Sequence, residues 1–249
     1  MSARWPANAP RASQGAAPAK TLLSIIIPLA PGDNAELGVL LDQLAALPVP
    51  AQVIVCRTDG SPAPVAPAQW PHGVTLLDVL SPPGRARQMN AGAGRACGRW
   101  LWFVHADSRL SAATLTALHA FLGRDIDALA YFDLAFRRDG PRLAALNAWG
   151  ANLRSRVFGL PFGDQGLLVR ASRFADLSGF DETRPCGEDH ALVWTARTAG
   201  LPLLRIAAPI ATSARKYSRH GWLRTTVEHL RLTAAQAWPA WRRLRKHVR

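Results

Sequence analysis

Residues 100–108 read WLWFVHADS, in which five apolar residues are followed by a polar group with one histidine and one aspartate. A continuous apolar run of this length is typical of a strand that is buried on both faces, as in a parallel sheet. Residues 24–28, which read SIIIP, form a second run of the same kind. Two such strands indicate the centre of an α/β sheet.

Strand and helix patterns alternate on both sides of these two runs. Further strands are predicted over residues 53–56, 74–79, 128–136 and 166–170. Helices with apolar residues at three- and four-residue spacing are predicted over 37–44, 85–97, 111–122, 143–157 and 188–200. Ser111 is expected to cap the third helix and Gly123 to end it. The alternation predicts an α/β fold, in which helices flank a mostly parallel sheet.

The composition divides the 249 residues into three parts. Residues 1–20 are rich in Ala and Pro and lack the apolar core of a secretion signal, so we expect a disordered leader. Residues 21–214 are predicted to form one continuous domain. Residues 215–249 form a tail with ten Lys or Arg and one acid, a net charge of +9 out of +13 for the whole chain. The basic character therefore belongs mainly to the tail.

Apolar residues recur in this tail at three- and four-residue steps and include Leu223, Val227, Trp238 and Trp241. A basic amphipathic helix with tryptophans is typical of proteins that lie on an anionic membrane surface. The same stripe could instead pack against the domain, and Pro239 is expected to break or kink the helix. Nucleic acid is not expected as a partner, because no nucleic-acid-binding motif accompanies the charge.

The cellular location follows from two further features of the sequence. No apolar run reaches the roughly 20 residues that a membrane-spanning helix needs. The three cysteines contain no CxxC pair, which fits a reducing compartment. We therefore expect a cytoplasmic protein, peripheral at the inner face of the membrane if the tail binds lipid.

Ligands of an open parallel sheet bind beyond the carboxyl ends of its strands. Polar residues follow the first, second and fourth predicted strands, at 32–34, 57–61 and 105–108, and we expect these three tips to converge. Asp107 ends a buried strand, and its carboxylate is a suitable ligand for a divalent cation that bridges phosphates. The alternative is that Asp107 caps the following helix, a role for which Ser111 competes.

Residues 84–93 read GRARQMNAGA and precede the strand at 100–104. Two arginines, Arg85 and Arg87, followed by Asn90 at a helix start, are a suitable cradle for a phosphate or a nucleotide. A solvated basic face on an ordinary helix is the alternative interpretation.

These stretches, in this order and spacing, resemble the motifs of the family 2 glycosyltransferases. The pair GRARQMNAG and HADS is similar, more narrowly, to the bacterial branch labelled radical-SAM/selenodomain-associated transferase. The resemblance continues with GDQ at 163–165, SGFD at 178–181 and GED at 187–189, and it covers about residues 22–222. It implies a GT-A, Rossmann-like fold that transfers a sugar from a nucleotide-diphosphate-sugar donor, with the basic amphipathic helical tail added.

The resemblance also implies roles for individual residues on the donor side. Those matched to the nucleotide base, the diphosphate and the metal are Pro28, Asp59, Arg85, Arg87, Asn90, His105, Asp107, Arg215 and Arg219. His105 stands where the family has the first acid of its DxD metal motif, so Asp107 is the candidate ligand for Mg²⁺ or Mn²⁺. His105 could still ligate a metal as a neutral imidazole.

On the acceptor side the resemblance matches Glu188 and Asp189 to a catalytic acidic pair, with Asp189 as the general base. An inverting transfer needs one carboxylate that takes the proton of the acceptor hydroxyl, and a helix N-terminus favours negative charge. Two ordinary helix-start acids are the alternative. Asp164 and Gln165 match a loop that faces the acceptor, although a glycine-bounded turn explains them equally well.

Two rival functions remain open. A sugar-phosphate nucleotidyltransferase shares this architecture but needs a basic glycine-rich loop after the first strand, where residues 29–34 read LAPGDN. A non-catalytic, membrane-associated binding module could keep the fold. Our main expectation is an inverting glycosyltransferase, for which a lipid-linked acceptor would suit the cationic tail.

Overall fold

The computed structural model describes residues 21–68, 70–227 and 231, and the side chains of Arg219 and His220 are outside this description. The predicted disordered leader at 1–20 and most of the predicted tail helix also lie outside the described residues.

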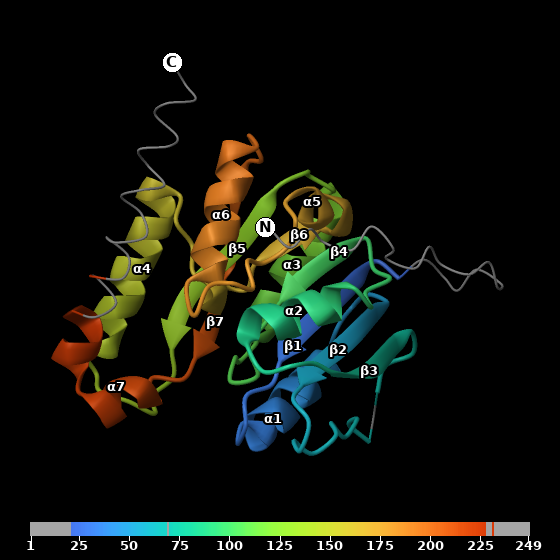
Figure 1. Ribbon diagram of the computed structural model, residues 1–249, viewed down its shortest axis with the longest axis horizontal. Coiled ribbons are helices and arrows are strands. Elements are labelled where there is room, and N and C mark those ends of the chain that lie inside the picture. Colours follow the sequence, from blue (N-terminus) through green and yellow to red (C-terminus); the bar gives the residue numbers. More distant parts are fainter. Residues whose placement is uncertain (1–20, 69, 228–230, 232–249) are drawn as a thin grey trace.

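A mostly parallel sheet of seven strands forms the centre of the molecule (Figure 1). Its strands are β1 (Leu23–Pro28), β2 (Ala51–Arg57), β3 (Val74–Leu80), β4 (Trp100–Phe103), β5 (Leu129–Phe136), β6 (Leu168–Arg170) and β7 (Leu203–Thr212). Their order in the sheet is β3-β2-β1-β4-β6-β5-β7. Only β6 runs antiparallel to its neighbours β4 and β5, whereas the other neighbouring pairs are parallel. The predicted fold class is confirmed.

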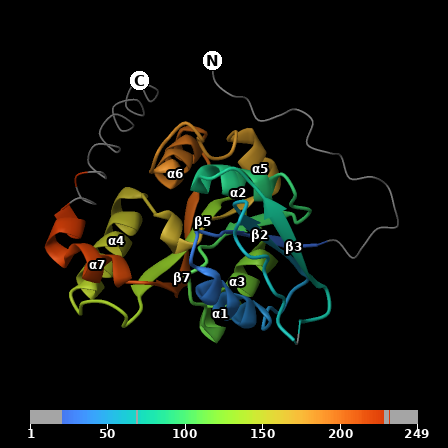
Figure 2. The ribbon, with the colours of Figure 1, turned by 60° about the horizontal axis from the view of Figure 1, so that its bottom comes forward.

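Helices cover both faces of the sheet (Figure 2). They are α1 (Asn34–Leu44), α2 (Arg85–Ala93), α3 (Ala112–Arg124), α4 (Ala144–Phe158), α5 (Ala171–Asp176), α6 (Glu188–Thr198) and α7 (Arg215–His220), with a 3-10 turn, η1 (Gly163–Gln165). One core cluster joins the sheet to α1 and α3, and a second joins the other face to α2, α5 and α6. Helices α4 and α7 lie together on the flank of the molecule beside β5 and β7 (Figure 2).

The isoleucines of β1 show why its apolar run is continuous. Ile25 and Ile27 belong to the cluster on the α1 and α3 side, whereas Ile26 belongs to the cluster on the opposite side. Successive side chains of a strand point to opposite faces, so a strand covered on both sides needs an apolar residue at every position.

Several predicted boundaries need correction. Helix α2 ends at Ala93, not near residue 97, and Gly98 lies so close to β1 that a Cβ there would be 2.5 Å from the Ser24 nitrogen. Helix α3 continues through Gly123, and Asp125 ends it in the left-handed conformation with φ 51°. A glycine is not required at this position because Asp tolerates that conformation better than most residues.

Two elements have no counterpart among the predicted ranges, namely α5 and β7. Strand β7, at one edge of the sheet, alternates between exposed and buried residues because only one of its faces packs on the core, through Ile206, Ala208 and Ile210. It contains Pro209 next to a shift in its register with β5 between Phe132 and Asp133. Pro is tolerated at edges and irregularities because it cannot donate a ladder hydrogen bond.

Helix α7 packs on the domain through Tyr217, which is buried with Ala144 and Ala214 in a third small cluster. Packed structure therefore continues beyond residue 214, where the sequence analysis placed the end of the domain.

Candidate functional site

The candidate site lies beyond the carboxyl ends of β1 and β4. These strands are neighbours in the sheet. The chain continues from β1 to β2 on one side of this pair, whereas the strands that follow β4 in the chain lie on its other side. Connections that diverge in this way leave a crevice between the two strand ends, where ligands of open α/β sheets bind.

The β4 tip provides His105, whose Nδ1 lies 2.8 Å from Oδ1 of Asp164 in η1. Burial lowers the pKa of the imidazole, but the hydrogen bond and negative charge of Asp164 outweigh it, and the pKa of His105 is raised. The carboxylate of Asp164 thus stabilises the protonated form of His105, at a position where the resembling family has an acid.

Asp107 follows in the same tip, and its surroundings disfavour the ionised form of its carboxylate. Burial raises the pKa of Asp107, and the nearby charges of Asp164 and Asp33 raise it further. The positive charge of His105 and a hydrogen bond from the Ser213 backbone act in the opposite direction but do not compensate. A cation beside Asp107 would relieve this excess of negative charge.

The donor set at this point fits a cation that the substrate helps to hold. No group of three His, Cys, Asp or Glu side chains within the described residues is arranged to bind a metal ion by itself. Mg²⁺ is often held by one or two carboxylates together with phosphate oxygens of a substrate. Asp107 suits this mode, since it is a half-buried carboxylate whose charge interacts with those of two further acids, Asp33 and Asp164.

Ser111, and not Asp107, caps helix α3. Its hydroxyl accepts a hydrogen bond from the Thr114 backbone at 3.1 Å, and the Thr114 hydroxyl accepts one from the Ser111 backbone at 3.1 Å. This reciprocal capping box satisfies the helix start. Asp107 therefore does not cap the helix that follows it, which was the alternative interpretation of this residue.

The acidic pair begins helix α6, and its two members have different surroundings. Asp189 accepts hydrogen bonds from the backbone N–H of Gly163 at 2.6 Å and of His190 at 2.8 Å. Glu188 is buried and forms an ion pair with Arg85. Asp189 is therefore held in place with part of its acceptor capacity still unused, because a carboxylate has about four lone-pair sites.

Gly163 connects Asp189 with the β4 tip. A Cβ at this position would lie 3.1 Å from Oδ2 of Asp189 and 3.5 Å from Nε2 of His105. The absence of a side chain thus allows η1 to enter the space between the two residues.

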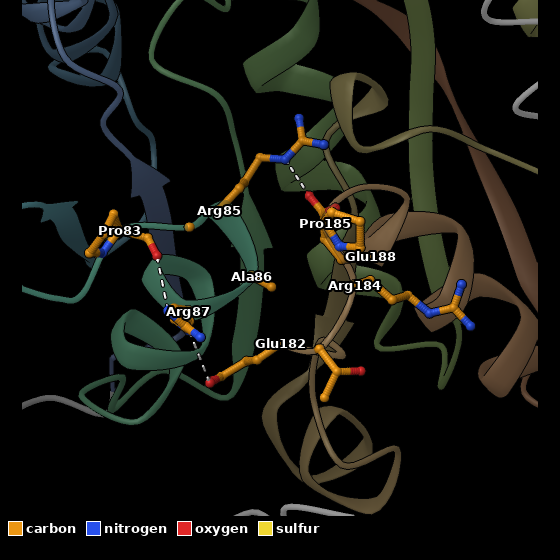
Figure 3. Close-up of a pocket in the computed structure, with 10 residues that line it drawn as sticks. Pro83, Arg85, Ala86, Arg87, Glu182, Arg184, Pro185 and Glu188 are labelled. Carbon is orange, nitrogen blue, oxygen red and sulfur yellow. Dashed lines mark hydrogen bonds and ion pairs between the residues drawn. The ribbon is translucent and has the colours of Figure 1, made fainter.

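Arg85 at the start of α2 reaches across a pocket of about 550 Å³ to Glu188, and Arg87 points from the same helix towards Glu182 (Figure 3). Burial works against the charge of Arg85, but Glu188, Asp189 and Asp164 together raise its pKa. The lining residues are Pro83, Gly84, Arg85, Ala86, Arg87, Glu182, Thr183, Arg184, Pro185 and Glu188. The volume lies within the range of small-ligand sites.

Asn90 and Gln165 have their side chains occupied by the fold. Asn90 donates to the Phe180 carbonyl at 2.9 Å and to Glu182 at 2.8 Å, and it accepts from the Phe180 backbone. The buried Gln165 donates to the Phe132 carbonyl at 2.9 Å and accepts from Ser155 at 2.8 Å. These contacts position the pocket wall and the η1 turn.

The remaining predicted site residues lie around the crevice or away from it. Pro28 is buried at the end of β1. Arg215 lies beside the β1 tip, 3.7 Å from Asp33. The β2 tip lies beside the β1 tip, since the Leu29 backbone donates to the Cys56 carbonyl at 2.8 Å and Gln88 donates to the carbonyls of both residues at 2.9 Å. At this tip Arg57 pairs with Asp78 of β3 at 2.7 Å, and the Asp59 side chain accepts a hydrogen bond from the Gly60 backbone.

Residues that the sequence analysis missed surround Asp189. Arg154 of α4 lies over the Phe162 ring at 3.3 Å, and His190 stacks on the same ring with centroids 5.1 Å apart. The charge of Asp189 acts on the pKa values of both Arg154 and His190. Arg154 gave no signal in the sequence, since it is one of many arginines and no motif contains it.

No protein-family model and no curated protein sequence matches the chain. Solved structures do match. A crystal structure of S. aureus TarS 1-349 has a TM-score of 0.56 and 15 % identity, over 78 % of this chain and 60 % of that one. The same TarS region in complex with UDP-GlcNAc has a TM-score of 0.55 and 17 % identity, over 78 % and 58 %.

The mannosyltransferase PcManGT from Pyrobaculum calidifontis, in complex with GDP-Man and Mn²⁺, has a TM-score of 0.59 and 18 % identity, over 87 % of this chain and 64 % of that one. The chain thus spans less than two thirds of the length of each of these structures. At such identities the similarity shows the fold, which is the GT-A-like α/β fold that the sequence predicted.

Proposed function

We propose that this chain is an inverting glycosyltransferase of the family 2 type that uses a nucleotide-diphosphate-sugar donor, with Asp189 as its general base. The observation that carries the proposal is the position of Asp189, fixed by two backbone N–H groups beside the β4 tip and close to the pocket of Arg85. The GRARQMNAG and HADS motifs support the radical-SAM-associated branch, a label that specifies no substrate.

In the proposed reaction the acceptor hydroxyl oxygen forms a bond to the anomeric carbon, and the bond from that carbon to the diphosphate oxygen breaks. The bonding pair leaves with the nucleoside diphosphate, and Asp189 takes the hydroxyl proton. Arg85, and His105 when protonated, would supply positive charge that stabilises the leaving diphosphate.

A divalent cation, Mg²⁺ or Mn²⁺, would neutralise part of the diphosphate charge when bound. Asp107 would hold it, and the concentration of negative charge formed with its acidic neighbours Asp33 and Asp164 supports this role. Fixed charges of this kind stabilise charge that develops in the transition state.

The remaining assignments complete the proposal. Donor contacts are proposed for Pro28, Asp59, Arg85, Arg87, Arg215 and Arg219, and an acceptor contact for Asp164. Asn90 and Gln165, predicted as contacts from the sequence, instead hold the pocket wall and the η1 turn. The fold supports Arg85, Arg87 and Arg215 best, because they lie at the pocket or at the β1 tip. The acceptor is proposed to be lipid-linked and the enzyme cytoplasmic, at an anionic membrane surface. No helix in the described part of the chain is long and apolar enough to cross a membrane.

A panel of nucleotide-sugars with Mn²⁺ or Mg²⁺ tests the proposal through donor hydrolysis and thermal stabilisation. Turnover of one donor would establish the reaction and identify the sugar. A folded protein that neither hydrolyses nor binds any donor would contradict it and favour the binding module.

A further inference from the structure

Helix α4 exposes an apolar stripe to solvent. Leu146 is 57 % exposed, Trp149 66 %, Leu153 43 % and Val157 62 %, and their three- and four-residue spacing places them on one side of the helix. The side that faces the domain has small residues instead, among them the buried Ala144, Ala148 and Ser155. Leu143 and Phe158 extend the exposed stripe at its two ends.

This stripe is unusual within the described residues. The large exposed apolar side chains outside α4 and residues 223–227 are isolated, at Val39, Val65 and Leu80. Single exposed apolar residues are normal on a protein surface, whereas a contiguous group indicates an interaction site.

The helical residues 222–227 lie beside α4 but leave the stripe uncovered. Trp222 donates to Asn147 of α4 at 2.7 Å, Asn147 donates to Thr226 at 2.8 Å, and Thr225 is buried. Leu223 and Val227 are 67 % and 36 % exposed. Trp222 and Thr226 therefore face α4, whereas Leu223 and Val227 are exposed.

Positive charge accompanies these apolar residues along the chain, with Arg142 next to Leu143 and Arg224 next to Leu223. Residues 137–163 contain five arginines and one acid, but Arg137 and Arg156 pair with Glu36 and Asp133, and Arg154 packs over Phe162. Residues 215–227 contain four Lys or Arg and no acid. Arg138, Arg142, Lys216 and Arg224 are exposed. An exposed apolar stripe with tryptophan, bordered by cations, is complementary to the surface of an anionic lipid bilayer.

We propose that α4 and residues 222–227 form one docking surface for an anionic lipid bilayer. The 15-residue helix α4, about 22 Å long, would lie in the plane of the interface with Trp149 and Leu153 at headgroup depth. The arginines beside it contact acidic headgroups. The surface belongs to the folded domain and does not depend on the tail beyond residue 231.

The docking surface is connected directly to the candidate site. Helix α4 leads into η1, which carries Asp164. Helix α7 follows β7, and the Ser213 backbone between these two elements donates a hydrogen bond to Asp107. Figure 1 shows α4 and α7 on the same flank of the molecule. If the proposed glycosyl transfer holds, an acceptor anchored in the bilayer would enter from this side.

The test uses the full chain and sedimentation with vesicles of phosphatidylglycerol and phosphatidylcholine, compared with phosphatidylcholine alone. The variant Trp149→Glu/Leu153→Glu places two acids in the stripe, and Val39→Glu/Leu80→Glu is the matched control at isolated exposed positions. We expect at least tenfold weaker binding of the α4 variant to anionic vesicles and unchanged binding of the control. Unchanged binding of the α4 variant would overturn the proposal.

A second measurement separates the bilayer from other occupants of the stripe. The thiol introduced by Leu153→Cys is expected to react rapidly with a maleimide in solution and slowly with anionic vesicles present, with peptide mass spectrometry as readout. Slow reaction without vesicles would mean that a second copy or residues 232–249 cover the stripe, and would also overturn the proposal. Binding to vesicles does not require a nucleotide-sugar donor. A nucleotide-sugar panel without turnover would therefore contradict the proposed function but would not affect the result of the vesicle experiment.

Discussion

Asp189 receives one backbone hydrogen bond on each carboxylate oxygen, from Gly163 and from His190. These contacts set the orientation of the side chain, and they leave lone pairs for a proton from a substrate. At the scale of single residues the site is therefore controlled by backbone groups as much as by charged side chains.

Asp189→Asn is expected to lower turnover by about 10²- to 10⁴-fold, because the amide cannot act as a general base. The measurement is donor turnover in the presence of acceptor, together with urea unfolding. Asp176→Asn, at an exposed ion pair on α5, is the matched control and should keep full activity. Equal turnover of Asp189→Asn and the wild type would exclude the catalytic role.

Asp107→Asn is expected to stabilise the protein without ligand, since burial raises the pKa of Asp107 and its ionised form is costly at neutral pH. The same variant should lose the Mn²⁺-dependent stabilisation by a nucleoside diphosphate, about 2.7 kcal/mol at 100 times Kd. Thermal unfolding with and without Mn²⁺ measures both effects. Stabilisation that Mn²⁺ still increases in the variant would argue against Asp107 as ligand.

At the scale of the elements, helix α3 shows how a local signal fixes a boundary. Ser111 and Thr114 exchange hydrogen bonds at its start, which confirms Ser111 as the predicted cap. The predicted end at Gly123 is wrong, because the left-handed residue that ends α3 is Asp125. Caps at helix starts depend on side-chain chemistry and are readable, whereas C-terminal ends depend on backbone conformation.

Ser111→Ala is expected to lower the free energy of unfolding by about 1 kcal/mol through loss of the cap. Thr116→Ala, at an exposed position within α3, is the control and should have no destabilising effect, because Ala is the better helix former. Urea unfolding measures both variants. A cost of Ser111→Ala no larger than that of the control would show that the capping box contributes nothing.

At the scale of the whole molecule, Glu36 of α1 joins distant parts of the chain. Its carboxylate forms ion pairs with Arg109 before α3 and with Arg137 after β5 at 2.7 Å, and it lies 3.4 Å from Arg215 of α7. Burial raises the pKa of Glu36, but the hydrogen bonds from Arg137 and Arg109 outweigh it and the pKa is lowered. This junction ties the α1 layer to the flank that carries α4 and α7.

Glu36→Gln is expected to destabilise the protein by about 2 kcal/mol at pH 7, the scale of hydrogen bonds to a charged group. A carboxylate with a lowered pKa in the folded state stabilises the fold above its unfolded pKa, and the contribution disappears as the pH falls through the folded pKa. The difference from the wild type should therefore shrink below about pH 4.5, the ordinary pKa of Glu.

The readout is urea unfolding between pH 3 and pH 7, with Asp42→Asn at an exposed position of the same helix as control. A difference between wild type and Glu36→Gln that stays constant over this range would refute the assignment.

The sequence by itself determined the strands β1 to β6, the starts of helices α1, α2, α3, α4 and α6 to within about three residues, and the fold class. Apolar periodicity is a local property, and it reports directly which faces of an element are buried. The site motifs were also readable, because His105, Asp107, Glu188 and Asp189 stand where one element ends or another begins.

Only the tertiary structure decided which of these residues meet. The contacts of His105 with Asp164, of Asp189 with Gly163 and of Arg85 with Glu188 join segments that are far apart in the chain. The same holds for Asn90, whose amide binds Phe180. A residue type specifies what a side chain can bind, but its partner depends on how the strands are ordered in the sheet, and that order is set by packing between distant segments.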